Sequence, residues 1–264
     1  MEAHYSLRQQ GWMCDRYPHC DHEMTTQQAK RLLSGGYFIR NSFDWDCQNE
    51  TQFWYVIKDT FGGIEELPSK VRNQVRKSLR CYEVRMVSSD EMAHDGFELF
   101  NLSRKRFGDD SLLVTREQWD KRCYGAGQDL WLAYDRETGK AQALAFNRRY
   151  EDYCSYVTMG VNPDAPGSTY PMYGLVYRMN EYYLQEQGLK YVLDGARSVT
   201  EHSNIQPFLE EKFRFRKAYC HIRLFYKPLI GCAVNMLFPM RRWIKHPKIQ
   251  AVLRQEAWKR NLAR

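Results

Sequence analysis

The sequence predicts an α+β fold in which helices flank a mixed, partly antiparallel central sheet. The first observation is a meander: the apolar and aromatic runs 129–135, 140–149 and 152–161 are separated only by the turn sequences DRETGK and RRYED, as in consecutive antiparallel strands. The second observation is the segment that follows. A long helix predicted at 168–188 precedes the short apolar run 189–197, the order expected of one crossover to a buried strand.

The segment before the meander alternates between helix and strand patterns. An opening threonine and a closing pair of glycines predict a helix at 25–36. Aromatic and β-branched residues predict strands at 37–43 and 51–59. Apolar spacing and capping residues predict the next four elements, which are helix 65–81, strand 82–88 and helices 89–107 and 115–125.

The elements after the meander follow from their end signals. Ser168 is expected to cap the long helix, with Pro171 in its first turn and Gly188 at its end. The buried strand 189–197 is then followed by a helix at 204–215 and a last strand at 217–227.

Length and composition permit a substantial core. The chain has 264 residues, of which 43% are hydrophobic and 14% aromatic, enough for one large domain or two small ones. No repeat, low-complexity run or Pro/Gly-rich linker divides it. We predict an N-terminal strand and helix portion at 1–64, packed on a main domain at 65–227, and an apolar, basic tail at 228–264.

Charge is distributed unevenly along the chain. The net charge is +7, and the segment 228–264 alone contains eight Lys and Arg against one Glu. The rest of the chain is therefore neutral overall. This argues against a general nucleic-acid-binding protein, because such domains carry a broad basic surface.

One helix nevertheless concentrates basic residues. LPSKVRNQVRKSLR, residues 67–80, contains five bases and no acid. An apolar row at intervals of four, expected to face the sheet, consists of Leu67, Val71, Val75 and Leu79. Arg72 and Arg76 then face outward, where they either form a solvated surface or meet a phosphate.

The residue order from about 82 onward resembles the GNAT acyltransferase superfamily. Two passages carry the likeness. One is the buried strand YVLDGAR (191–197), followed by a helix with Asn204 near its start. The other is PFLEEKFRFRKAY (207–219), similar to the helix, Gly-Phe and strand passage of that fold, with Arg214 in place of the usual glycine.

The basic helix narrows the resemblance to the Fem-type transferases. In that branch a strand precedes a helix of the form L-x-x-K-x-R-x-x-I-R-K-x, and this chain matches it at Leu67, Lys70, Arg72, Val75, Arg76 and Lys77. The likeness covers roughly residues 50–227 and corresponds to one GNAT-like domain with an N-terminal portion, whereas the family usually has two such domains.

The resemblance implies an N-acyltransferase. Such an enzyme moves an acyl or aminoacyl group from an activated donor, linked to CoA, a carrier protein or tRNA, to an amine acceptor, here in envelope or polysaccharide biosynthesis. It implies no metal and no tightly bound cofactor, with acyl-CoA or another activated acyl donor as co-substrate. Aside from tRNA as a donor, no specific nucleic acid is expected.

The resemblance also implies where the donor binds. Donor phosphates in the superfamily lie at the N-terminus of the helix after the fourth strand, which here is Gly167, Ser168 and Thr169. The superfamily's Q/R-x-x-G-x-G/A loop is absent, as it is in the Fem branch. Arg72 and Arg76 could contact phosphate beside the same site. An ordinary helix cap at Ser168 is the alternative.

Candidate residues for the reaction come from the buried strand and its neighbours. Asp194 could accept the proton of the attacking amine, or simply pair with Arg197. Asn204 could hydrogen-bond the donor, or cap its helix. Tyr170 and Tyr173 could line the site, or belong to the core.

The remaining features concern metal, membrane and location. Cys14, His19, Cys20 and His22 are zinc-ligand types, but their spacing fits no standard finger. The tail 228–264 suits contact with an anionic membrane, or else a helix pair packed on the domain. The start lacks an apolar signal region, which predicts a cytoplasmic protein, peripheral at the inner membrane if the tail binds there.

Two further function classes stay open. A binding module that has kept the fold without catalysis is one, supported by the absent phosphate loop. A nucleic-acid-binding protein that uses residues 67–80 and the tail is the other.

Overall fold

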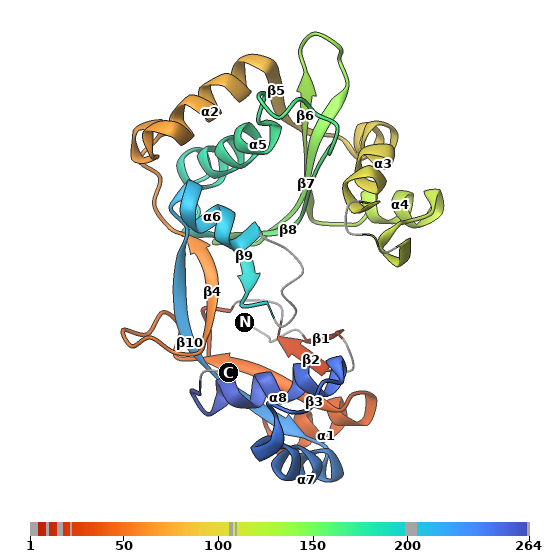
Figure 1. Cartoon of the computed structure of the whole chain (residues 1–264), viewed down its shortest axis with the longest axis vertical. Coiled ribbons are helices and arrows are strands. Elements are labelled where there is room, and N and C mark those ends of the chain that lie inside the picture. Colours follow the sequence, from red (N-terminus) through yellow and green to blue (C-terminus); the bar gives the residue numbers. More distant parts are fainter. Residues whose placement is uncertain are drawn as a thin grey trace. The chain divides into compact units, whose positions relative to one another are not determined.

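The computed structural model describes residues 5–8, 11–14, 18–21, 23–105, 108, 110–198 and 205–262 (Figure 1). The chain forms two compact units, each assembled from separate segments. Unit 1 contains 1–56, 196–204 and 217–264, and unit 2 contains 57–195 and 205–216. This division follows compactness alone. It does not test the three parts expected from the sequence, 1–64, 65–227 and 228–264, which remain a prediction.

Unit 2 is built on the predicted meander. Its strands are β5 (Tyr82–Val87), β6 (Gln128–Asp135), β7 (Ala141–Arg149), β8 (Tyr153–Val161) and β9 (Tyr191–Ala196). They lie in the order β9-β8-β7-β6-β5. The four strands from β5 to β8 pair antiparallel, whereas β9 pairs parallel with β8. A parallel pair requires a crossover, which is supplied here by helix α5 (Pro171–Asn180).

Helices cover both faces of this sheet. On one side lie α2 (Ser69–Cys81) and α5, and on the other lie α3 (Ser89–Lys105) and α4 (Arg116–Cys123) (Figure 1). The unit also contains α6 (Ile205–Phe213) and two short 3₁₀ turns, η1 (Ile64–Glu66) and η2 (Asp110–Leu112).

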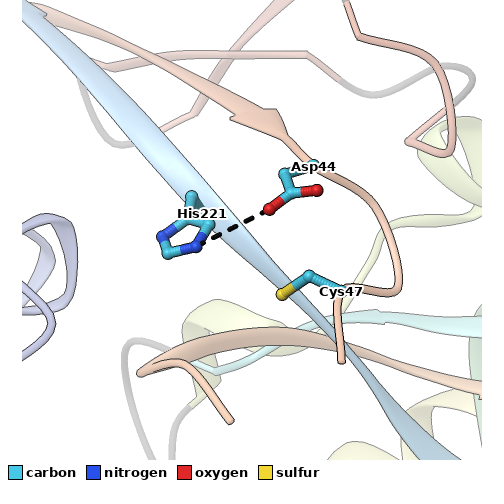
Figure 2. Close-up of side chains that lie close together, drawn as sticks. All are labelled: Asp44, Cys47 and His221. Carbon is cyan, nitrogen blue, oxygen red and sulfur yellow. Dashed lines mark ion pairs between the residues drawn. The ribbon is translucent and has the colours of Figure 1, made fainter. Parts of the chain in front are cut away.

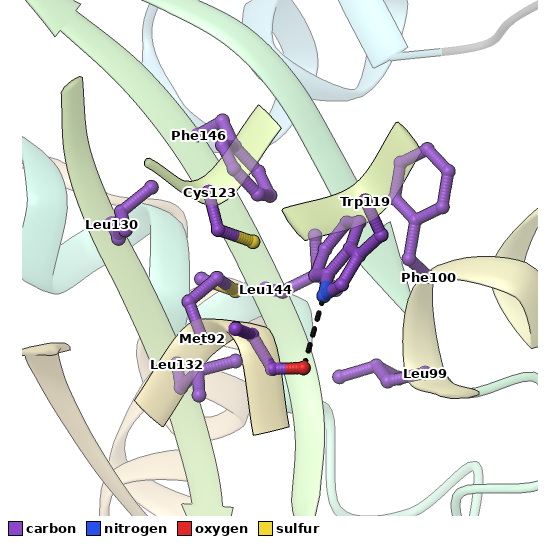
Figure 3. Close-up of a cluster of buried hydrophobic side chains, with 10 residues drawn as sticks. Met92, Leu99, Phe100, Trp119, Cys123, Leu130, Leu132, Leu144 and Phe146 are labelled. Atoms are coloured by element: carbon purple, nitrogen blue, oxygen red, sulfur yellow. Dashed lines mark hydrogen bonds between the residues drawn. The ribbon is translucent and has the colours of Figure 1, made fainter. Parts of the chain in front are cut away.

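The core under α3 and α4 shows why these helices pack where they do. Trp119 is fully buried and lies against Phe100 and Phe146, with ring centroids 5.1 and 5.3 Å away (Figure 3). Its indole N–H donates to the carbonyl oxygen of Ala93 at 3.2 Å, so the one polar atom of this side chain is satisfied.

The basic helix α2 packs mainly on another helix. Leu67, Val71 and Val75 are buried as predicted, but α2 contacts α5 as well as β5. The expectation that this apolar row faces the sheet is therefore only partly right. The two helices are in close contact at Gly174, whose N–H donates to the hydroxyl of Ser78 at 3.0 Å.

Unit 1 has the strand order β1-β2-β3-β10-β4, formed by β1 (Tyr5–Arg8), β2 (Gly11–Cys14), β3 (Phe38–Phe43), β10 (Arg216–Tyr226) and β4 (Phe53–Lys58). β1 pairs antiparallel with β2, β2 parallel with β3, and β3 antiparallel with β10. The predicted mixed, partly antiparallel sheet flanked by helices is thus confirmed.

Helices of unit 1 come from both ends of the chain. These are α1 (Thr26–Gly35), α7 (Pro228–Leu237), the 3₁₀ turn η4 (Phe238–Met240) and α8 (Pro247–Lys259). Thr25 caps α1 in a capping box with Gln28. α7 and α8 pack on each other through Val234, Phe238, Leu253 and Ala257. Across the described part of the chain, each helix is too short or too polar to cross a bilayer.

Two local departures from the sequence analysis matter for the site. The helix expected from Ser168 begins at Pro171, after Tyr170, which has a left-handed backbone (φ 57°). Ser168 is therefore not the cap. The end of the predicted helix is a π-helical turn, Glu181–Glu186, a form common at functional sites.

Arg214 stands where the GNAT passage usually has glycine. Its φ is 60°, in the left-handed region that favours glycine. The backbone at Arg214 thus adopts a conformation that a glycine would adopt without strain.

Candidate functional site

The candidate site lies in unit 2, where β8 and β9 part. The register between these parallel strands covers three pairs, which end at Ser155 and Leu193. Next along β8 is Tyr156, and next along β9 is Asp194. The register of β7 with β8 shifts at the same level, between Phe146 and Asn147, and a bulge of this kind bends its strand and redirects a side chain.

Asp194 is the predicted catalytic residue, and its surroundings favour the uncharged acid. Burial raises the pKa of this carboxyl to about 8, and a hydrogen bond from Gln206 of α6 opposes part of that rise. A nearby cation would lower the pKa instead, so burial dominates here. Arg197, the alternative partner, donates to the carbonyl oxygen of Gln52 at 2.6 Å and lies over the Trp54 ring.

Tyr156 of β8 is a neighbour of Asp194, because the Asp194 carboxylate affects its pKa. Its hydroxyl is buried and donates to Oδ1 of Asn180 at 2.8 Å. Burial raises the pKa of Tyr156 well above its usual value, and the Asp194 carboxyl adds to the rise. The phenol therefore stays neutral and remains a hydrogen-bond donor.

A second buried tyrosine anchors the π-helical turn to the sheet. The Tyr183 hydroxyl donates to Oδ2 of Asp129 at 3.0 Å and accepts from Nε1 of Trp131 at 2.9 Å. Nδ2 of Asn147 lies 3.3 Å from the same hydroxyl. Hydrogen bonds between buried groups fix the positions of the groups that they join, although among the described residues Oδ1 of Asn147 has no hydrogen-bond partner. The network therefore holds α5 and its π turn in register with β6 and β7.

The predicted donor-phosphate residues occupy the loop before α5. Gly167 and Ser168 are exposed. The Thr169 hydroxyl donates to the carbonyl oxygen of Pro166 at 2.6 Å and accepts from the Tyr82 hydroxyl at 2.5 Å. Pro171 lacks an N–H, so the first turn of α5 offers one donor fewer to a phosphate than an ordinary helix start.

The predicted arginines face outward from α2 but pair with a carboxylate. Arg76 bonds Glu65 at 2.9 Å, and Arg72 bonds the other oxygen of the same Glu65. Thr169 contacts Tyr82, directly after α2, and Arg72 lies ten residues earlier. At 1.5 Å per helical residue that separation is about 15 Å. The structure therefore does not join Arg72 to the Gly167–Thr169 loop in one compact site.

The other sequence candidates are placed as follows. Tyr173 stacks edge-on against Phe208 at 5.2 Å and contacts Phe213, as a packing residue would. Asn204 lies outside the described residues, as does His22 of the N-terminal Cys/His group. Sequence reasoning missed Tyr156, Asn180 and Gln206, although the alternation of SYVTMG indicated that Tyr156 faces inward.

The chain has a GNAT-like, Fem-type fold, as predicted. The elements that define this fold are the meander, the α5 crossover, the parallel strand β9 and the following helix α6.

No family model matches the chain, and no curated protein matches it. Among solved structures, the C-terminal domain of a putative lysylphosphatidylglycerol synthetase from Agrobacterium fabrum is similar, with a TM-score of 0.56 and 12% identity over 89% of this chain and 84% of that one. FemX is similar with a TM-score of 0.52 and 11% identity, over 86% of this chain and 73% of that one. Identities this low show the fold alone.

Proposed function

We propose that the chain is an acyl or aminoacyl transferase that moves its group from an activated donor to an amine. One observation carries the proposal: the carboxyl of Asp194 lies where β8 and β9 part, and burial brings its pKa to about 8. A general base works best when its pKa is near the operating pH. Strongly shifted pKa values of this kind cluster at functional sites.

The proposed reaction assigns one task to each group. Ionised Asp194 accepts a proton from the acceptor ammonium, and the neutral amine then attacks the acyl carbonyl. The new C–N bond forms as the bond to the thiol or ribose oxygen of the donor breaks, and the departing group takes up a proton. The Asp194 carboxylate raises the pKa of Tyr156, so the Tyr156 hydroxyl stays neutral and donates within the same buried region.

We expect the donor to carry negative charge. Acyl-CoA, an acyl carrier protein and aminoacyl-tRNA are all anionic, and the N-terminal end of α5 attracts anions. The similar structures are named FemX and a putative lysylphosphatidylglycerol synthetase. The second name joins a lysyl group to phosphatidylglycerol, which favours an aminoacyl donor and a lipid acceptor.

The test is transfer of a radiolabelled acyl group from each donor class to amine acceptors. We expect transfer from one donor class, loss of transfer in Asp194→Asn and partial activity in Asp194→Glu. Thermal stabilisation by a donor without any transfer would instead identify the binding module. A lack of response to every donor, together with binding to random DNA that weakens with salt, would favour the nucleic-acid-binding protein.

We also propose that α7, η4 and the segment before α8 contact an anionic membrane surface. Three large apolar side chains are unusually exposed there: Leu229 by 85%, Met236 by 75% and Trp243 by 79%. Exposed Arg242, Lys245 and Lys248 flank Trp243. Apolar side chains beside outward-facing bases are the combination that binds anionic lipid surfaces.

A cavity supports the membrane proposal. It has a volume of about 600 Å³ between α7, α8 and the start of β3, and its lining is mainly apolar, including Ile230, Val234, Leu237 and Val252. An apolar cavity beside exposed tryptophan and basic residues could accept part of an acyl chain.

A further inference from the structure

Away from the proposed transfer site, three metal-ligand side chains converge in unit 1. Asp44 and Cys47 lie in the turn after β3, and His221 lies on β10 (Figure 2). One ligand atom from each lies within 4.8 Å of the others. The His221 imidazole Nε2 is 3.8 Å from Oδ2 of Asp44.

The backbone holds this trio in place. Asp44 and Asp46 both have left-handed φ angles, 58° and 55°, which fold the turn back toward β10. The N–H of Cys47 then donates to the carbonyl oxygen of Tyr219 on β10 at 3.0 Å. The N–H of Asp44 donates to Oδ1 of Asp21 at 2.9 Å.

His221 is fixed by its place in the sheet. It is paired with Phe43 in the β3–β10 register, and the two rings stack with centroids 5.5 Å apart. Phe43 directly precedes Asp44, so the same pairing positions both ligands. The three side chains are thus brought together by strand register and turn geometry.

The ligand set selects a class of cation. A thiolate, an imidazole and a carboxylate are the ligands of zinc, with bonds of about 2.0–2.3 Å, whereas calcium and magnesium prefer oxygen ligands only. Tetrahedral bonds of that length place ligand atoms about 3.3–3.8 Å apart. The ligand atoms lie within 4.8 Å of one another, so the closing movement is at most about 1.5 Å, within reach of side-chain rotation.

A nucleophilic triad would need a different arrangement. In such a triad the imidazole lies between thiol and carboxylate and uses both ring nitrogens. Here the carboxylate faces Nε2, and Figure 2 shows the thiol on the same side of the ring as the carboxylate. Convergence on one point is what an ion requires.

We propose that Asp44, Cys47 and His221 bind one Zn²⁺ ion, with water in the fourth position. The Asp44 side chain is 58% exposed, so an ion can enter from solvent. The bound ion would tie the turn between β3 and β4 to β10 and stabilise unit 1 in proportion to its affinity. This site is independent of the proposed transferase activity. It also differs from the N-terminal Cys14, His19 and Cys20, which the sequence offered as ligands.

Cobalt(II) titration of the full-length, chelator-treated and reduced protein tests the site. We expect one Co²⁺ per chain, visible absorption of a tetrahedral ion and a near-ultraviolet thiolate charge-transfer band, all removed by Zn²⁺. Cys47→Ser should lose the charge-transfer band. Cys232→Ser, a matched change at an exposed thiol of α7, should keep it. Asp44→Asn and His221→Gln should weaken binding by more than about tenfold, since even outer-shell changes cost that much.

A second measurement guards against misfolded variants. Added Zn²⁺ should raise the melting temperature of the wild-type chain and of Cys232→Ser, but not that of Cys47→Ser. The proposal is overturned if the band survives in Cys47→Ser, or if it is lost instead in a Cys14→Ser/Cys20→Ser variant. A wild-type chain that shows neither a cobalt band nor a zinc-dependent melting shift also overturns it.

Discussion

At the residue scale, Asp194 links function to stability through one ionisation. Its pKa rises from 3.8 to about 8 on folding, so between those values the folded chain holds a proton that the unfolded chain has lost. Stability must then fall as pH rises through this window. We expect the melting temperature of Asp194→Asn relative to wild type to increase from about pH 5 to about pH 8. Asp164→Asn, an exposed change in the loop before α5, should show no such trend, and a flat difference for Asp194→Asn would contradict the assigned pKa.

The same ionisation should appear in the kinetics. If Asp194 is the base, transfer should rise with pH to a plateau above the pKa of about 8. Asp194→Asn should remove this limb and lower the rate by about 10²–10⁴-fold. The measurement is a pH–rate profile of kcat/KM with the active donor. Retention of the limb in Asp194→Asn would assign it to another group.

Lys58 carries a buried positive charge, and its ion pair with Glu66 should contribute to the stability of the fold. Its side chain is 1% exposed, and its Nζ lies 2.8 Å from Oε1 of Glu66. Glu66→Gln leaves the ammonium buried without its counter-charge, which should cost about 3–5 kcal/mol in urea denaturation. The double variant Lys58→Met/Glu66→Gln should cost less, because no charge is then buried. As a control, Glu83→Gln breaks the exposed pair with Arg85 and should cost about 1 kcal/mol or less.

At the element scale, the contact of α2 with α5 depends on one glycine. A Cβ at Gly174 would lie 2.4 Å from the Ser78 hydroxyl oxygen. Gly→Ala inside a helix normally stabilises by about 0.5–1 kcal/mol, but here overpacking should destabilise by about 1–3 kcal/mol. Adding Ser78→Ala should recover part of the loss in thermal denaturation. Gly167→Ala, where a Cβ meets nothing within 4 Å, should leave the melting temperature nearly unchanged, and equal effects at both glycines would contradict the packing argument.

The outer face of α2 offers a test of the arginine row. Glu65 pairs with both Arg72 and Arg76 and offsets one of their two charges, so Glu65→Gln should strengthen binding of an anionic donor if these arginines meet phosphate. Arg72→Gln/Arg76→Gln should raise the KM for that donor while the melting temperature stays within about 2 °C, since exposed ion pairs add little stability. Unchanged KM values in both variants would indicate that the arginines form a solvated surface and do not meet phosphate.

At the scale of the whole molecule, the sequence predicted most elements because each is specified locally. Periodicity and turn residues placed the meander, the basic helix and the strand that carries Asp194. The start of α5 was misplaced because Ser168 resembles a cap, whereas the left-handed Tyr170 and Pro171 set the true boundary. No local pattern could reveal the parting of β8 from β9, or the meeting of Asp44 with His221, because strand register brings together residues far apart in the chain.

The basic tail gives the last prediction, which concerns the net charge of the whole chain. The excess positive charge lies entirely in 228–264, and part of it is paired: Arg260 bonds buried Glu256 at 2.9 Å. The side chains of Arg242, Lys245 and Lys248 are exposed, and a base near an anionic surface contributes about 1 kcal/mol. We expect the protein to sediment with phosphatidylglycerol vesicles, but not with neutral phosphatidylcholine vesicles, and to be released by high salt.

Variants separate the apolar and basic contributions to this binding. Trp243→Ser and Leu229→Ser should each weaken sedimentation at any salt concentration, because they remove apolar insertion. Arg242→Gln/Lys245→Gln should weaken it most at low salt. Leu112→Ser, a change at a residue of η2 that is 40% exposed, should have no effect. If Trp243→Ser instead dissociates a dimer in sedimentation velocity while vesicle binding persists, the exposed face is an interface between two copies of this chain rather than a membrane contact.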